Sequence, residues 1–155
     1  MSVAKMFHPF WKHLLIDGVG NLESVTVKAM LVSPAYTFDP DDEFVSDVVA
    51  AEVSGTGYAA GFAGAGRVTI ASLAVTVDNT NDWVKVDAAD PSWAGINLGA
   101  TQIGGIILWL PKTSDADSPL ICYDGTAAGG FPVTTSGGTF THAWSANGIF
   151  RFKHP

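Results

Sequence analysis

The sequence predicts a mainly β protein, an antiparallel β-sandwich or barrel of about seven or eight short strands with one or two short helices. Short segments alternate apolar and polar side chains, as in SVTVKAMLV at 24–32 and WVKVD at 83–87. Clusters of Gly, Pro, Asn and Asp, the residues that favour turns, separate these segments. A chain of 155 residues suits one domain, so we expect a single β-rich domain over residues 1–155.

The first predicted element is a short helix over residues 9–16, PFWKHLLI. Pro9 suits the first helical position, where a missing N–H costs nothing. Phe10, Leu14 and Phe7 would share one face of this helix. Residues 1–20 then have two open roles: a contact arm that reaches a partner, or a cover over one open end of the sandwich.

The next elements are a strand at 24–32 and a helix at 41–49. The alternation at 24–32 predicts one buried face, made by Val25, Val27, Ala29 and Leu31. In DDEFVSDVV at 41–49, Asp41 or Asp42 would cap the helix N-terminus. The buried stripe of this helix would consist of Phe44, Val45, Val48 and Val49.

The pattern in the second half of the chain predicts short strands joined by turns. RVTIASLAVTVD at 67–78 predicts a long strand bent near Ser72, and DNTND a turn into a hairpin with 83–87. Further strands are predicted at 103–111, 119–125, 139–145 and from 148 onward. Between them we expect a long loop with at most a short strand at 89–101, a turn at 112–118, and a loop or edge at 126–138.

The composition predicts a surface that meets another protein. Charged residues make up 15% of the chain, against roughly 25% in typical soluble domains. Hydrophobic residues reach 47%, more than a domain of this size can easily hide, so an apolar surface left open to a partner is expected. The alternative is a compact Gly- and Ala-rich monomer with a weakly charged surface.

Two classes of partner are not expected. The formal net charge is −7, and the eight Lys and Arg residues are scattered. Nucleic-acid binding normally needs a basic stripe, so we expect none. The longest apolar run, at 103–111, is too short to span a bilayer. The first residues contain no clean apolar signal region, so synthesis and folding in a cytoplasm are expected.

The acidic run at 39–43 resembles a calcium loop only in part. Asp39, Asp41 and Glu43 have the alternating spacing of ligands. An EF-hand loop counted from Asp39 needs Gly at its sixth position and an acid at its twelfth, where this chain has Phe44 and Ala50. A helix start explains the same acids, so no metal site is predicted.

Other signatures of chemistry are also missing from the sequence. The glycines at 55–67 match neither phosphate-binding spacing, and a strand follows them where a helix is needed; we expect them to allow turns or close packing. We predict that Cys122 is a buried, inert thiol and that His142 is a hydrogen-bonded residue on a core face. We therefore predict no catalytic residue, no cofactor and no enzyme activity.

Five aromatic residues are candidates for partner contact. Trp11 lies in the N-terminal segment with Phe7 and Phe10, and aromatic anchors often dominate interfaces. Trp93 and Tyr58 lie in predicted loops, where either could meet a partner or stack on a sugar. The core interpretation is preferred for the tryptophans at 83, 109 and 144, because they fall in strand patterns.

The chain resembles a group of small structural proteins encoded by tailed bacteriophages. The resemblance includes FHPFWKHLLIDGVGNLESVTVKAMLV and AYTFDPDDEFVSDVVAAEVSGTGYAAG, and continues through GRVTIAS, VDNTNDWVKVDAADPSWAG, SPLICYD and GGTFTHAWSANGIF. EVSGTGY at 52–58 and the stretch at 78–93 are its most specific parts. FAGAG at 62–66 departs from the pattern and indicates a longer loop.

The resemblance implies a virion component rather than an enzyme. It points first to a capsid decoration, or cement, protein that bridges major capsid subunits, located at the capsid surface and forming homo-oligomers within the virion. The alternative is a tail, baseplate or fibre-associated protein that touches a receptor glycan through Trp93 or Tyr58. A small β-sandwich hydrolase or lectin unrelated to phage is a third possibility.

Overall fold

The computed structural model describes residues 4–17 and 21–153 and confirms a mainly β fold. In this part of the chain, two α-helices and two 3₁₀ turns accompany ten strands. The helices are α1 (His8–Leu15) and α2 (Val45–Val48), and the 3₁₀ turns are Val49–Ala51 and Ala127–Gly129. The strands are β1 (Lys5–Met6), β2 (Lys28–Val32), β3 (Val68–Thr69), β4 (Ala74–Asp78), β5 (Trp83–Asp87), β6 (Ser92–Trp93), β7 (Gly105–Trp109), β8 (Leu120–Asp124), β9 (Phe140–Thr141) and β10 (Phe150–Lys153).

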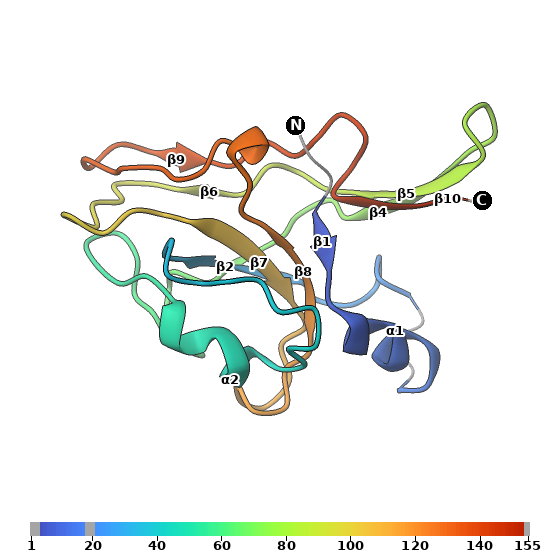
Figure 1. Cartoon of the computed structure of the whole chain (residues 1–155), viewed down its shortest axis with the longest axis horizontal. Helices are drawn as coiled ribbons and strands as arrows, with labels where there is room; N and C mark the ends of the chain where they lie inside the picture. The colour runs from blue at the N-terminus through green and yellow to red at the C-terminus, as the bar shows by residue number, and fades with distance from the viewer. Residues whose placement is uncertain (1–3, 18–20, 154–155) are drawn as a thin grey trace.

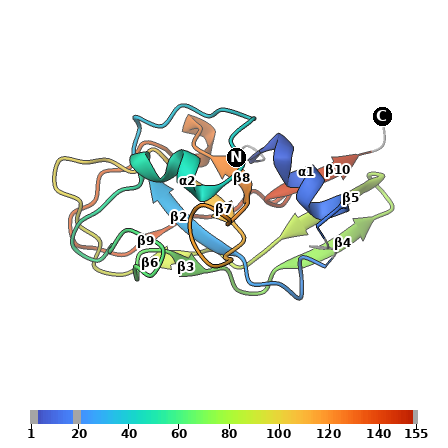
Figure 2. The same ribbon diagram turned by 90° about the horizontal axis from the view of Figure 1, so that it is seen from below.

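The described strands form three antiparallel sheets. The largest has the order β1-β8-β7-β2-β3, the second β10-β5-β4, and the third β6-β9. One face of the large sheet packs against the two small sheets, so the molecule is a sandwich with a divided second layer (Figure 1). Figure 2 shows α2 near one end of β2 and α1 beside the three-stranded sheet at the opposite end.

The large sheet is buried on both faces. Ala29 and Leu31 join the core against the small sheets, whereas Met30 joins a second core under α2. All five residues of β7 and of β8 are buried as well. The prediction of one buried face for 24–32 was therefore wrong, because α2 and the segment around Phe38 cover the side expected to meet solvent.

The segment 67–78 does not form one strand. Its first part, β3, pairs with β2 in the large sheet, and its second part, β4, pairs with β5 in the three-stranded sheet. The change of sheet occurs near Ser72, whose φ of 54° is unusual for a residue other than Gly. The prediction of one long strand was therefore wrong, because the chain changes sheets near Ser72, whereas the predicted β4–β5 hairpin is confirmed.

The N-terminal segment packs on its own chain. Residues Lys5–Met6 add an edge strand to β8, and α1 follows with Pro9 in its first turn, as predicted. Phe10, which lies on this helix, is fully buried. For residues 4–17 the structure thus favours the covering role over a free arm; residues 1–3 and 18–20 of the expected arm lie outside the described part.

Helix α2 begins later than predicted. Asp41 and Asp42 do not cap it; Asp47 instead accepts hydrogen bonds from the backbone N–H groups of Glu43 and Phe44, at 3.0 and 2.9 Å. Val45 and Val48 are buried, whereas Phe44 and Val49 are half-buried. A carboxylate inside the first turn satisfies free donors as an N-cap would, and this local bond was not visible in the acidic run.

The Gly-rich loop allows close packing, as predicted. A Cβ atom at Gly66 would lie 2.6 Å from the ring of Tyr58, and one at Gly57 would lie 2.6 Å from the carbonyl oxygen of Gly95. Gly57 also has a positive φ of 75°. Larger side chains would push this loop off the sheet, which explains its composition without a bound phosphate.

Candidate partner-binding surface

The three-stranded sheet is amphipathic. Its strand register places Val75 opposite Val86, and Val77 opposite Val84. The β10 register places Phe152 opposite Val84. Because directly opposite residues project to the same side of a sheet, these side chains form one apolar face. The other face carries Thr76, Lys85, Asp87 and Arg151.

The apolar face is buried at one end and exposed at the other. Val86 is 1% exposed and Phe150 3% exposed, because both join the main core. Val75 is 38% exposed and Val77 70% exposed. The sheet thus extends beyond the core that it helps to close, and its outer part presents apolar side chains to solvent.

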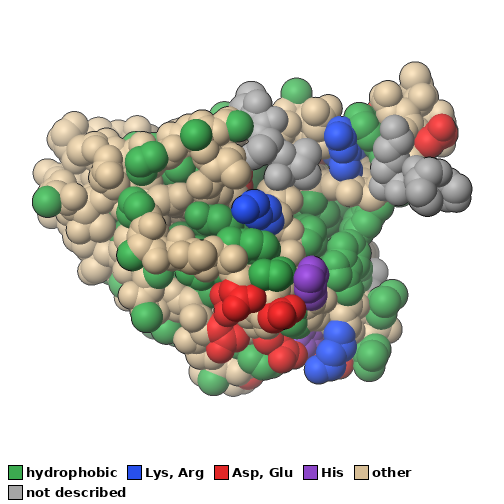
Figure 3. Space-filling view, viewed as in Figure 1, with side chains coloured by type: hydrophobic (Ala, Val, Ile, Leu, Met, Phe, Trp, Pro, Cys, Tyr) green, Lys and Arg blue, Asp and Glu red, His purple; other side chains and the backbone are tan. Residues whose placement is uncertain are grey.

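Helix α1 extends this apolar surface on the other side of a cleft. Leu14, Val75 and Phe152 are among the side chains that line a cavity of about 260 Å³ between the helix and the sheet. Leu15 and Ile16, at the end of the helix, are 81% and 74% exposed. Figure 3 shows hydrophobic side chains gathered between the sheet and α1. We call the exposed apolar side chains Leu15 and Ile16 of α1 and Val75 and Val77 of β4, together with the cleft, the apolar platform.

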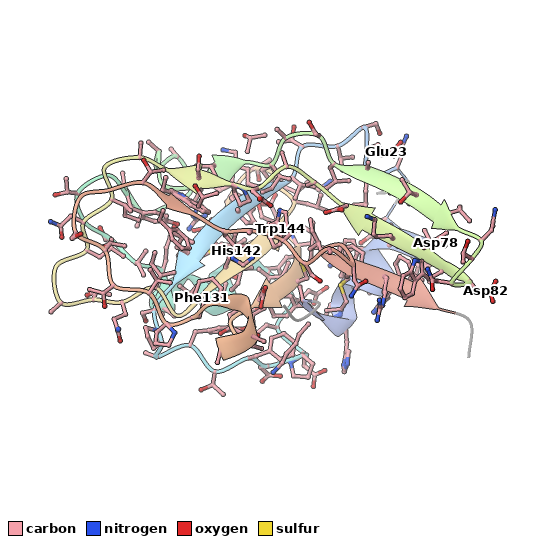
Figure 4. The ribbon with its side chains drawn as sticks, turned by 90° about the horizontal axis from the view of Figure 1, so that it is seen from above. Glu23, Asp78, Asp82, Phe131, His142 and Trp144 are labelled. Atoms are coloured by element: carbon pink, nitrogen blue, oxygen red, sulfur yellow. The ribbon has the colours of Figure 1, made fainter. Side chains whose placement is uncertain are left out.

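Acidic side chains border the platform. Glu23 accepts a hydrogen bond from the backbone N–H of Val75, at 2.7 Å. Asp78 ends β4, and hydrogen bonds, first that from the Asn81 side chain, hold its pKa below the usual range. Figure 4 places Glu23 beside β4, with Asp78 and Asp82 toward the hairpin tip. Glu23 therefore places a carboxylate at the edge of β4, whereas Asp78, opposite Trp83, projects from the polar face of the sheet.

Four of the five predicted contact residues are not on the surface. Phe7 and Phe10 are fully buried, Tyr58 is 1% exposed and Trp93 is 2% exposed. Their prediction as contact residues, and that of Trp93 or Tyr58 as a sugar platform, was wrong for this fold. Large aromatic rings give the most favourable burial, and the segments that looked like loops lie directly over the core.

The polar atoms of these aromatics are also satisfied internally. The Tyr58 hydroxyl donates to Glu52 at 3.0 Å and accepts from the Leu31 N–H at 3.0 Å. The Trp93 indole N–H donates to the Gly66 carbonyl at 2.7 Å. Trp11 alone of the five is half-buried, and its ring meets Phe152 edge-on at 4.9 Å. It lies beside the platform and stays a predicted contact residue.

The residues that define the platform were missed by the sequence analysis. Leu15 and Ile16 follow the expected helix pattern, and Val75 and Val77 follow the expected strand pattern. Those patterns do not tell which apolar residues are covered by a neighbouring element. In the described chain, no neighbouring element covers these four. The one available signal was the composition of the whole chain, because its apolar content exceeded what a core of this size holds.

The acidic side chains of segment 39–47 form hydrogen bonds and ion pairs with nearby residues of the chain. Tyr36 donates to Asp42 at 2.8 Å, and Asp39 accepts from the Asp41 N–H at 3.0 Å. From α1, His8 lies 3.2 Å from Asp41 and Lys12 lies 3.4 Å from Glu43. No group of three or more potential metal ligands occurs among the described residues. These acids thus mainly hold α1 and the turn together.

His13 lies between two carboxylates. Its Nδ1 is 2.5 Å from Asp17 Oδ2, and its Nε2 is 3.1 Å from Glu43 Oε1, within ion-pair distance but outside hydrogen-bond angles. The imidazole itself is 6% exposed. It therefore ties α1 to the segment before α2.

His142 and Asp124 form a second buried pair. His142 Nε2 lies 3.4 Å from Asp124 Oδ2, and the two side chains are 2% and 6% exposed. The ring stacks on Phe131 at 5.3 Å and meets Trp144 edge-on at 4.6 Å. Figure 4 shows the three rings together. The predicted core-facing position of His142 is confirmed, but its buried Nε2 makes no hydrogen bond within the described residues, so the predicted hydrogen-bonded state is not found there.

Cys122 is buried, as predicted. It is 1% exposed on β8, and burial, followed by the nearby Asp124 carboxylate, raises the pKa of its thiol. A thiol held in its neutral form is a poor nucleophile. The residue therefore contributes to packing and is not arranged for covalent chemistry.

Comparison with known proteins adds no relative: no protein-family model, curated protein or solved structure matches this chain. Among the described residues, no helix is long and apolar enough to cross a membrane. The site and its chemistry are therefore argued from the molecule alone. Its features define a β-sandwich with exposed apolar side chains on α1 and β4.

Proposed function

We propose that the chain is a bacteriophage virion structural protein, and specifically a capsid decoration protein that bridges major capsid subunits. The apolar platform is the single observation that carries this proposal. Large apolar side chains at 70–81% exposure, as for Leu15, Ile16 and Val77, are unfavourable in water and are typical of surfaces that another protein covers. The sequence resemblance supplies the kind of assembly.

The platform also suits repeated use within a shell. A decoration subunit needs a rigid scaffold and an interface that is covered only after assembly. Here the sandwich core supplies the scaffold, and α1 and the three-stranded sheet present the interface from two sides of one cleft. The partners are the major capsid protein, further copies of this chain, or both.

The tail or baseplate placement is the competing outcome. A tail protein that binds a receptor glycan through Trp93 or Tyr58 is not supported, because both residues are buried and their polar atoms are hydrogen-bonded inside the chain. A tail protein that binds only other proteins would use the same apolar platform. Location in the virion is thus the property to be measured.

The direct test is a binding assay with purified mature heads that lack tails and this protein. Wild-type protein is mixed with heads, the heads are pelleted, and bound copies per head are counted. Saturable binding at hundreds of copies per head supports decoration. No saturable binding contradicts it and favours the tail placement.

Matched variants connect binding to the platform. Leu15→Ser and Ile16→Ser remove exposed apolar side chains, so their folding stability is expected to change by less than about 0.5 kcal/mol. Thr76→Ser, on the opposite face of β4, serves as the control. We expect each platform variant to weaken head binding while Thr76→Ser does not. Equal binding by all variants would place the interface elsewhere.

A further inference from the structure

A polar cleft lies on the face of the three-stranded sheet opposite the apolar platform. Its floor includes Thr76, Trp83 and Lys85, which the strand register places on the polar face. Its walls are the turn 79–81 and the loop residues 146–147. Figure 1 shows the hairpin turn after β4 and the loop before β10 rising on the same side of the sheet. The volume of the cleft is about 630 Å³, within the range of small-molecule sites.

Hydrogen bonds hold the turn and the tryptophan in place. The Asp78 carboxylate accepts from the backbone N–H groups of Thr80 and Asn81, at 2.9 and 3.0 Å, and from the Asn81 side chain at 2.8 Å. It also accepts from the Trp83 indole N–H at 3.0 Å. A ligand would therefore meet a turn and an indole ring whose positions are already fixed, which lowers the entropy cost of binding.

The loop before β10 is fixed on β5. The Gly148 N–H donates to the Ser145 carbonyl at 2.8 Å, and the Ile149 N–H donates to the Val86 carbonyl at 2.8 Å. Gly148 has a φ of 86°, and a Cβ atom there would lie 2.6 Å from the Val86 carbonyl oxygen. Because only Gly allows this close approach, the loop lies directly against the sheet and holds Asn147 at the rim of the cleft.

Polar side chains in the cleft are left without a partner in the described chain. Those that are exposed and make no hydrogen bond within the described residues are Thr76, Asn79, Thr80 and Asn147. Lys85 also lines the cleft, but it is paired with Asp87 at 3.0 Å. The free groups are thus neutral hydroxyls and amides, which both donate and accept hydrogen bonds. They match a ligand whose own groups do the same.

The Trp83 ring adds an apolar surface beside these groups. The Arg151 guanidinium lies 4.1 Å from the ring centroid and covers one face of the indole. Trp83 lines the cleft and Arg151 does not, so the side of the indole turned to the cleft is one that Arg151 leaves free. A sugar ring has a C–H face that packs on an aromatic ring and hydroxyls that both donate and accept.

We propose that this cleft binds a neutral pyranose at the end of a glycan chain. Trp83 supplies the packing surface, and the side chains of Asn79, Thr80 and Asn147 bond the sugar hydroxyls. Because the cleft and the apolar platform lie on opposite faces of the sheet, a subunit held through the platform still presents the cleft to solvent. The inference goes beyond the proposed function and does not depend on it.

The test is an NMR titration of the folded full chain with methyl glycosides of glucose, galactose, mannose and N-acetylglucosamine. Their blocked anomeric carbon mimics a glycan linkage, and concentrations reach tens of millimolar, where weak single-sugar binding is measurable. Sorbitol is the control, because it has hydroxyls but no ring to pack on Trp83. We expect saturable shifts with at least one glycoside, largest at Trp83, Thr80 and Asn147. No saturable shift, shifts centred elsewhere, or equal shifts with sorbitol would overturn the proposal.

Two substitutions of Trp83 test the packing surface. Trp83→Phe keeps an aromatic face, whereas Trp83→Leu keeps only apolar bulk. We expect Trp83→Leu to weaken glycoside binding at least about fivefold more than Trp83→Phe does, as the loss of an aromatic contact predicts. Equal effects of the two folded variants would show that the ring is not the packing surface and would contradict the proposal.

Asn147→Ala gives a readout even if the Trp83 variants do not fold, because the Asn147 side chain makes no hydrogen bond within the described residues. We expect at least about fivefold weaker glycoside binding, the effect of one lost hydrogen bond. Thr101→Ala, exposed and outside the cleft, is the matched control and should bind like wild type. Wild-type affinity in Asn147→Ala would remove the cleft as the site.

Head binding separates this inference from the proposed function. If the protein binds a glycoside but not heads, the sugar site stands and decoration fails. If it binds heads but no glycoside, decoration stands and the sugar site fails. Asn147→Ala should bind heads as wild type does; loss of head binding in this variant would place the cleft in the head interface and overturn the sugar site.

Discussion

Arg67 and Glu52 form a bidentate ion pair inside the protein. Arg67 Nε lies 2.8 Å from Glu52 Oε1, and Nη2 lies 2.7 Å from Oε2, with both side chains at most 2% exposed. Asp115 accepts from the same guanidinium at 2.5 Å, and the Trp109 ring lies 5.2 Å from it. The pair holds together the two ends of the segment that contains the Gly-rich loop, and the bond to Asp115 joins it to the turn before β8.

Removal of Arg67 is expected to be strongly destabilising. Arg67→Met leaves the Glu52 carboxylate buried without its counter-charge, which costs about 3–5 kcal/mol of unfolding free energy. The double variant Arg67→Met with Glu52→Gln should recover part of this loss, since Gln remains able to accept from Tyr58 and carries no charge. Chemical denaturation measures both. A double variant no more stable than Arg67→Met would contradict the buried-charge explanation.

Phe10 and Trp11 are neighbours on α1 with different expected roles. Phe10 is fully buried, so Phe10→Ala should lower the free energy of unfolding by about 3–5 kcal/mol. Trp11 is half-buried beside the platform, so Trp11→Ala should cost about 1 kcal/mol and weaken head binding. Denaturation and head sedimentation, measured on both variants, test this division. A larger stability loss for Trp11→Ala than for Phe10→Ala would reverse the assignment.

Asp117 is expected to make the turn before β8 sensitive to acid. Hydrogen bonds, first that from the Thr113 hydroxyl, lower the pKa of Asp117 from 3.8 to about 2. Because the folded-state pKa is the lower one, this carboxylate stabilises the fold above about pH 4, and its contribution is lost as the pH falls toward about 2. Asp117→Asn should therefore destabilise the protein at neutral pH and make little difference near pH 2.

Denaturation of wild type and Asp117→Asn across this pH range provides the measurement, and carboxyl NMR of Asp117 provides the control. A stability difference that stays constant with pH would show that the carboxylate's charge does not hold the turn. A titration midpoint at the ordinary value would show the same.

Cys122 should resist thiol reagents while the protein is folded. The side chain is 1% exposed, and burial raises the pKa of its thiol, so both access and thiolate are lacking. Ellman's reagent should react fully in denaturant and at least about a hundredfold more slowly in buffer, because reaction then requires opening of the large sheet. Rapid labelling of the native protein would indicate an exposed or ionised thiol.

Local patterns in the sequence predicted much of the fold. Alternation at 83–87, the turn at 78–82 and Pro9 at the start of a helix all correspond to elements of the structure. These features depend on neighbours within a few residues, because side-chain period and turn chemistry act over that range. The bend at Ser72 and the buried Cys122 were predicted for the same reason.

The surface was decided by contacts between distant segments. Phe10 and Val77 both lie in apolar patterns, yet Phe10 is fully buried and Val77 is 70% exposed. Tyr58 and Trp93 looked accessible in predicted loops, but those loops fold over the core. The amino-acid sequence by itself thus determined the β character, the hairpin and the excess of apolar side chains. Only the tertiary structure decided which of them face solvent, because burial depends on elements that pack together from far apart in the chain.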